Sequence, residues 1–132
     1  SPGAHNEPDI AAGFVRLDFA PEARPLDNED IAENGAQLAA LCRHHGVNHL
    51  VYVGFAINWC ILMSPGGMVD LARHGCLCST IAEAVTAVEN RETAARELEK
   101  QQALWRVAVE FGFVFALSDF LSALPLRSAP SS

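Results

Sequence analysis

The segment Asn48-His-Leu-Val-Tyr-Val-Gly-Phe-Ala-Ile-Asn-Trp-Cys60 decides how this chain folds. Its apolar, β-rich run from Leu50 to Val53 predicts a buried strand that stops at Gly54. An amphipathic stretch begins close to Cys60, so the cysteine is expected at a strand-to-helix junction. A helix N-terminus offers unpaired N–H groups and the positive end of the helix dipole, which favour a thiolate and can hold an oxyanion. This position makes Cys60 a candidate nucleophile.

The rest of the chain alternates helices with strands. Helices are expected over residues 29–45 and 92–111, and strands over 48–54, 76–82 and 113–117. Asp27 or Asn28 is a suitable N-cap for the first helix, and Gly46 is a suitable C-cap for it. Ser118 is a suitable N-cap for a short final helix. Residues Phe14 to Phe19 form a further, short strand in this interpretation. Such alternation predicts parallel β–α units that bind ligands at the carboxyl ends of the strands, where Cys60 lies.

The run Gly54-Phe-Ala-Ile-Asn-Trp-Cys60 resembles the nucleophile segment of the isochorismatase-like cysteine hydrolases, which include nicotinamidases and N-carbamoylsarcosine amidohydrolases. Residues 75–93 resemble the next strand and loop of that family, and Leu117-Ser-Asp-Phe-Leu-Ser-Ala-Leu124 resembles its closing segment. The resemblance covers about residues 31–124. It implies an α/β fold, a parallel sheet with flanking helices in a three-layer sandwich, of which this chain carries only the C-terminal half. Residues 1–28 are then a flexible lead, 29–124 the half-domain and 125–132 a tail.

The resemblance also implies a site. Members of the family have a non-proline cis peptide shortly before the cysteine, which corresponds here to Phe55–Ala56. Cys60 is then the nucleophile, and the N–H groups of Ala56 and Cys60 hold the oxyanion. Phe55, Asn58 and Trp59 are the expected substrate contacts. The implied activity is hydrolysis of the C–N bond of a small amide through a covalent intermediate.

Each of these residues also has a purely structural interpretation. Phe55 and Trp59 could wall a substrate pocket or simply pack, and Asn58 could orient a substrate or close a turn. A cysteine after a strand is commonly a packing residue. Cys42 lies on the apolar stripe of the first helix, and Cys76 and Cys78 share one face of a strand, so core filling is favoured over a metal pair. We therefore expect no metal and no cofactor.

Two departures from the family pattern concern the groups that activate the cysteine. Family members use an aspartate at the end of the first strand as base and a lysine upstream of the cysteine. The single lysine here, Lys100, lies downstream, and Asp18 is too close to Cys60 for the intervening elements. Ile57 replaces a common threonine, and Ala82-Glu83 replaces a common Arg-Asp pair. The chain therefore resembles the second half of such a domain, with the nucleophile but without the family's recognisable activators.

Replacements within the chain have no motif support. Glu83 and Asp30 are the local carboxylates, and Arg16 or Arg24 could supply a positive charge. A base and lysine from another polypeptide are the more economical hypothesis. The alternative is a non-catalytic binding or assembly subunit. A sheet of only three strands also leaves an edge uncovered, so we expect a second chain, identical or complementary, to pair with it and make the strand at Leu50–Val53 central.

Composition excludes several other classes of protein. The chain has 132 residues, 50% of them hydrophobic and 19% charged, enough for one modest core. A net charge of −7, with scattered basic residues, argues against binding to nucleic acid. The longest apolar run, Leu50 to Phe55, is far shorter than the roughly 18 residues of a membrane span. Four cysteines without a disulfide-like spacing and a polar N-terminus favour a cytoplasmic protein that binds no membrane.

Overall fold

A computed structural model of the protein describes residues 6–15 and 17–125. The chain divides into two units, residues 1–31 and residues 32–132.

The first unit contains helix α1, Glu7–Phe14, and the 3₁₀ turn η2, Pro21–Ala23. The predicted strand at Phe14–Phe19 is therefore wrong, because Phe14 ends a helix and Leu17 to Phe19 have no regular structure. Pro8 in the first turn and the acidic residues Glu7 and Asp9 favour a helix at this point. Residues 1–5 of the predicted lead and Arg16 lie outside the described residues, as do residues 126–132 of the predicted tail.

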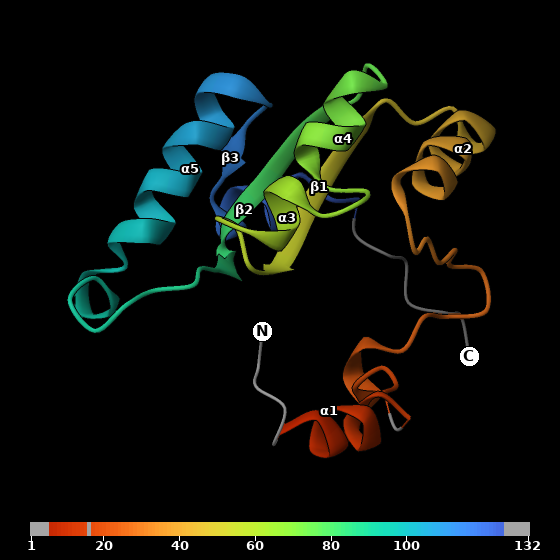
Figure 1. Cartoon of the computed structure of the whole chain (residues 1–132). Helices are drawn as coiled ribbons and strands as arrows, with labels where there is room; N and C mark the ends of the chain where they lie inside the picture. The colour runs from red at the N-terminus through yellow and green to blue at the C-terminus, as the bar shows by residue number, and fades with distance from the viewer. Residues whose placement is uncertain (1–5, 16, 126–132) are drawn as a thin grey trace, which may run out of the picture. The chain divides into compact units, whose positions relative to one another are not determined.

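The second unit is built on a parallel sheet of three strands in the order β1-β2-β3. Its strands are β1, His49–Phe55, β2, Leu77–Thr86, and β3, Val114–Phe115. Its helices are α2, Gly35–His45, α3, Cys60–Met63, α4, Met68–Arg73, α5, Leu98–Glu110, and α6, Leu117–Ala123, with the 3₁₀ turn η3, Ala94–Arg96, before α5. This arrangement confirms the predicted α/β class with a parallel sheet and flanking helices (Figure 1).

Both predicted helix starts are corrected. Helix α2 begins at Gly35 rather than residue 29, because Asn34 is the N-cap and its side chain accepts a hydrogen bond from the Gln37 N–H at 3.0 Å. The predicted caps Asp27 and Asn28 lie outside the helix. Helix α5 begins at Leu98 rather than residue 92. The predicted Gly46 C-cap is confirmed, since Gly46 has the left-handed φ of 64° that glycine adopts without strain.

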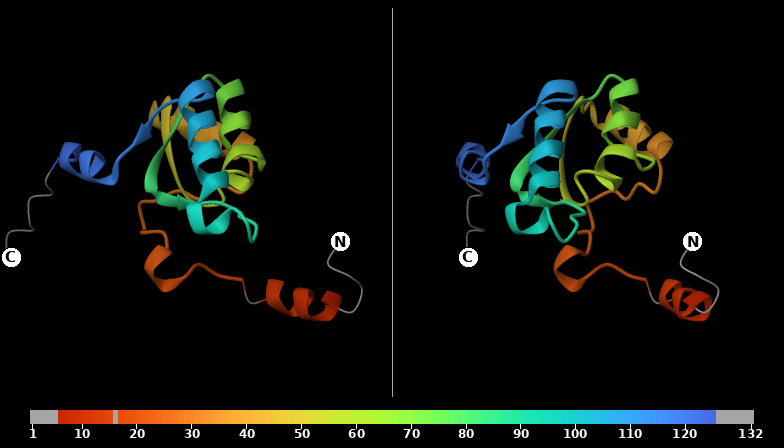
Figure 2. Two further views of the ribbon diagram at one scale, coloured as in Figure 1. Left: turned by 90° about the vertical axis from the view of Figure 1, so that its left-hand side faces the viewer. Right: turned by 60° about the vertical axis from the view of Figure 1, so that its left-hand side comes forward.

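Helices α3, α4 and α5 lie on one face of the sheet, and α6 lies on the other (Figure 2). The core lies on the first face, where Leu71, Met68 and Val107 are completely buried against the strands. Cys42 and Cys78 belong to this core and Cys76 packs against it, as predicted from the sequence. The core thus holds α3, which begins at Cys60, firmly against β1.

Strand β1 is at one edge of this sheet, and β2 is its central strand. Alternate side chains of β1 point away from the helical layer that covers Leu50 and Tyr52. On that outer face Val51, Val53 and Phe55 are 36%, 56% and 64% exposed. The described part of the chain therefore leaves both the outer edge of β1 and an apolar strip beside it uncovered.

Candidate functional site

Cys60 lies at the carboxyl end of β1 and is the first residue of α3, as predicted. Its side chain is exposed. The connection between strand and helix is tight, because the Ala56 carbonyl accepts hydrogen bonds from the N–H groups of Trp59 at 3.1 Å and Ile61 at 3.0 Å. The Phe55–Ala56 peptide is cis. The sequence therefore located the strand-to-helix junction correctly.

Two backbone donors at this junction are left unused by the residues that the structure describes. Among the described residues, none accepts a hydrogen bond from the N–H of Ala56 or of Cys60. Ala56 itself is completely buried, whereas its neighbour Ile57 donates to the Thr86 carbonyl at 2.9 Å. Buried N–H groups are normally paired, so free donors next to a thiol are a feature that a bound oxyanion would satisfy.

Asn58 ties this junction to the loop that follows β2. Its amide nitrogen donates to the Val88 carbonyl and its amide oxygen accepts from the Val88 N–H, both at 2.9 Å. The amide therefore closes the junction against a loop 30 residues away, which matches the structural interpretation of Asn58. This pairing fixes the positions of the neighbouring Trp59 and Cys60.

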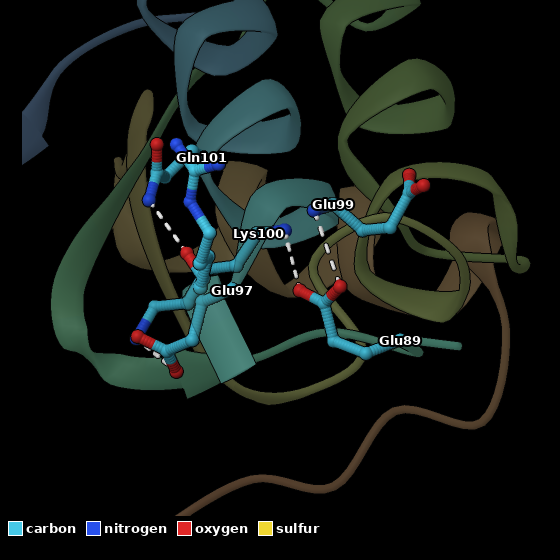
Figure 3. A network of polar contacts seen from close by, with 6 residues as sticks. Glu89, Glu97, Glu99, Lys100 and Gln101 are labelled. Atoms are coloured by element: carbon cyan, nitrogen blue, oxygen red, sulfur yellow. Dashed lines mark hydrogen bonds and ion pairs between the residues drawn. The ribbon is translucent and has the colours of Figure 1, made fainter. Parts of the chain in front are cut away.

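The start of α5 is held next to the same loop by Glu89 (Figure 3). The Glu89 carboxylate accepts hydrogen bonds from the N–H groups of Glu99 at 3.2 Å and Lys100 at 3.0 Å. Partial burial would raise the pKa of Glu89, but these two bonds and the Thr93 hydroxyl outweigh it and lower the pKa. An anion that receives the first free N–H groups of a helix stabilises that helix end.

A cleft of about 250 Å³ lies between the α3 junction and α5. The junction contributes three lining residues, Asn58, Trp59 and Leu62. Helix α5 contributes the other five, which are Glu99, Gln102, Ala103, Trp105 and Arg106. Of the three predicted substrate contacts, Asn58 and Trp59 thus line this cleft, whereas Phe55 does not. Cys60 is not among its lining residues.

The α5 side of the cleft was missed by sequence reasoning. Three of these residues follow Glu99 by three, four and seven positions: Gln102, Ala103 and Arg106. This spacing places all four on one face of a helix. That spacing was available in the sequence as a signal. It did not show that this face lies opposite Trp59, because that depends on how α5 packs on the sheet.

The carboxylates and cations that the sequence offered as activators have other partners. Glu83 accepts a hydrogen bond from the Leu117 N–H at 2.9 Å and so caps α6, a role predicted for Ser118. Lys100 is paired with Glu97 at 3.5 Å. Arg24 is paired with Asp18, and Asp30 belongs to the first unit. In the described ranges, no hydrogen bond or ion pair reaches the Cys60 sulfur.

Burial changes the ionisation of two other cysteines, Cys42 and Cys78. Burial raises the pKa of Cys42, and the proximity of Cys76 adds to this effect. Burial, again with a contribution from Cys76, raises the pKa of Cys78 to about 11. Both thiols are therefore protonated near neutral pH. Within the described residues no group of three or more His, Cys, Asp or Glu side chains could hold a metal ion.

No protein-family model matches the chain, and neither does any curated protein. Its fold is similar to the crystal structure of an isochorismatase-like hydrolase from Alkaliphilus metalliredigens, with a TM-score of 0.61 and 18% sequence identity. The match covers 80% of this chain and 57% of the other. The chain therefore has an isochorismatase-like hydrolase fold and spans little more than half the length of that structure. No helix among the described residues is long and apolar enough to cross a membrane.

Proposed function

We propose that the chain is the nucleophile-bearing part of a cysteine-dependent hydrolase that cleaves the C–N bond of a small amide. The observation that carries this proposal is the exposed Cys60 thiol at the carboxyl end of β1, next to the unused N–H groups of Ala56 and Cys60. The likeness in fold to an isochorismatase-like hydrolase supports it.

In the proposed reaction the Cys60 thiolate attacks the amide carbon, and the carbonyl oxygen becomes an oxyanion. The N–H groups of Ala56 and Cys60 donate hydrogen bonds to that oxyanion. The C–N bond then breaks, the amine leaves with a proton from a general acid, and an acyl-enzyme remains on the sulfur. Water hydrolyses this thioester and regenerates the thiol.

The activating base and positive charge come, in this proposal, from another polypeptide. Helix α3 has only four residues, so its dipole is a weak substitute for them. Two observations on the described residues favour a second chain: the free outer edge of β1, and the exposed Val51 and Val53 beside it. Strands added at that edge would lie next to the end of β1 that leads to Cys60, within reach for a base.

A non-catalytic binding or assembly subunit is the second candidate. It is favoured by the absence, among the described residues, of any hydrogen bond or ion pair at the Cys60 sulfur. The two candidates differ in the reactivity expected of the thiol once the partner is present.

Thiol labelling of the protein purified from its natural source, together with any chain that accompanies it, tests the proposal. Iodoacetamide should modify Cys60 before Cys42 and Cys78, because the first is exposed and the other two are buried with raised pKa values. The pH dependence of the Cys60 labelling rate should have a midpoint well below the roughly 8.5 of a free thiol.

Cys60→Ser is the variant that tests the role of the sulfur. It should abolish amidase activity and the fast labelling while leaving the far-UV circular dichroism unchanged. Cys76→Ser is the matched control, since Cys76 packs against the core. This variant should retain both the amidase activity and the fast labelling of Cys60. A labelling midpoint at the free-thiol value, or activity that survives in Cys60→Ser, would support the non-catalytic candidate instead.

A further inference from the structure

Both tryptophans of the chain, Trp59 and Trp105, line the cleft between the α3 junction and α5. They are 58% and 65% exposed, although tryptophan is among the side chains that gain most from burial. They come from segments 46 residues apart in the sequence, so their meeting in one cleft is a product of the fold. Two accessible indole rings in one small cleft provide aromatic faces for a ligand.

The cleft is lined by one acidic and one basic side chain, Glu99 and Arg106. The backbone N–H of Glu99 donates a hydrogen bond to the Glu89 carboxylate. The Glu99 side chain points away from Glu89, as Figure 3 shows, and lines the cleft. Among the described residues, none forms a hydrogen bond or ion pair with the half-buried Glu99 carboxylate. The other charged residue of the cleft, Arg106, is already paired with Glu110, with 3.4 Å between Nε and Oε1. Of these two charged side chains, Glu99 is therefore the one without a partner among the described residues.

We propose that this cleft binds a small organic cation, with its ammonium group beside the Glu99 carboxylate and against the indole rings of Trp59 and Trp105. A cation is attracted to the face of an aromatic ring, most strongly to that of tryptophan, and to a carboxylate. The net charge of −7 adds a long-range attraction for cations. A cleft of about 250 Å³ is smaller than the roughly 300–1,000 Å³ of sites for drug-sized ligands, which limits the ligand to a few heavy atoms.

The proposed cation site is separate from the chemistry assigned to Cys60. The sulfur-bearing residue does not line the cleft, although Trp59 precedes it directly. Cation binding therefore does not depend on the proposed hydrolase activity. A Cys60→Ser variant should bind the cation as well as the original chain does.

Choline is the probe, and intrinsic tryptophan fluorescence of the full chain is the assay. Because the chain has two tryptophans and both line the cleft, the emission reports on this site alone. Choline should produce a saturable change in emission with a dissociation constant in the millimolar range. The neutral analogue in which carbon replaces the quaternary nitrogen has the same shape without the charge. It should bind at least about fivefold more weakly.

Substitutions then locate the binding. Glu99→Gln should weaken choline binding about tenfold, since it removes the charge and keeps the shape of the side chain. Glu92→Gln is the matched control, because it makes the same change in charge at an exposed residue outside the cleft, and it should bind as the original chain does. Trp59→Leu and Trp105→Leu should each weaken binding about two- to fivefold, with the remaining tryptophan as reporter.

Several outcomes would overturn the proposal. Emission that does not respond to choline, equal affinity for the neutral analogue, or unchanged binding by Glu99→Gln would each do so. Emission that changes with protein concentration but not with choline would mean that the two indoles contact a second chain instead. Since Cys60→Ser is included, loss of amidase activity and loss of cation binding are separate results.

Discussion

Raising the pH from below 9 to about 11 should destabilise the protein through Cys78. This thiol is completely buried in the central strand β2, and burial raises its pKa from 9.0 to about 11. Below pH 9 the thiol is protonated in both the folded and the unfolded chain, so the stabilisation is fully present. Between pH 9 and 11 the unfolded chain releases the proton while the folded chain retains it, and the stabilisation is lost as the pH rises.

The size of this effect follows from the pKa change. A pKa that rises from 9.0 to about 11 on folding contributes about 2–3 kcal/mol to the free energy of unfolding, at roughly 1.4 kcal/mol per pKa unit. Because other groups also titrate in this range, the quantity to measure is the difference in unfolding free energy between the original chain and Cys78→Ala. That difference should shrink by about 2–3 kcal/mol between pH 8 and 11.

Urea unfolding followed by far-UV circular dichroism gives both free energies. Val85→Ala is the matched control, because Val85 is a buried residue of the same strand without a titratable group. The free-energy difference between the original chain and Val85→Ala should stay constant over the same pH range. A constant difference for Cys78→Ala as well would refute the reasoning, since it would mean that the buried thiol does not retain its proton.

Two further predictions concern the edge of the sheet and the turn between α3 and α4. The isolated chain should associate in sedimentation equilibrium, because Val51 and Val53 are exposed beside the free edge of β1. Val53→Lys should weaken that association, and a folded monomer with cooperative unfolding would contradict the prediction. Gly67→Ala should lower the free energy of unfolding by about 1–3 kcal/mol, because an added Cβ would lie 2.8 to 2.9 Å from three backbone carbonyl oxygens around α3. Gly13→Ala, where an added Cβ meets nothing within 4 Å, should not lower it, and equal effects of the two changes would contradict the steric argument.

Local patterns in the sequence were sufficient to locate the elements around Cys60. The apolar run before Gly54 identified β1, and Gly46 identified the end of α2, because both signals depend on neighbouring residues only. The start of α2 was misplaced, since several residues before Asn34 are also suitable N-caps and only one can satisfy the first free N–H groups. Ambiguity of this kind cannot be removed by local pattern alone.

The sequence by itself determined that this is a parallel α/β protein with a cysteine at the end of a strand, because strand and helix periodicities are written in short stretches. Only the tertiary structure decided what surrounds that cysteine. The pairing of Asn58 with Val88, the capping of α6 by Glu83 and the meeting of Trp59 with Trp105 join residues 30 to 46 positions apart. Such contacts depend on the register of the strands and on the packing of α5 against the sheet, and one residue of slippage would break them.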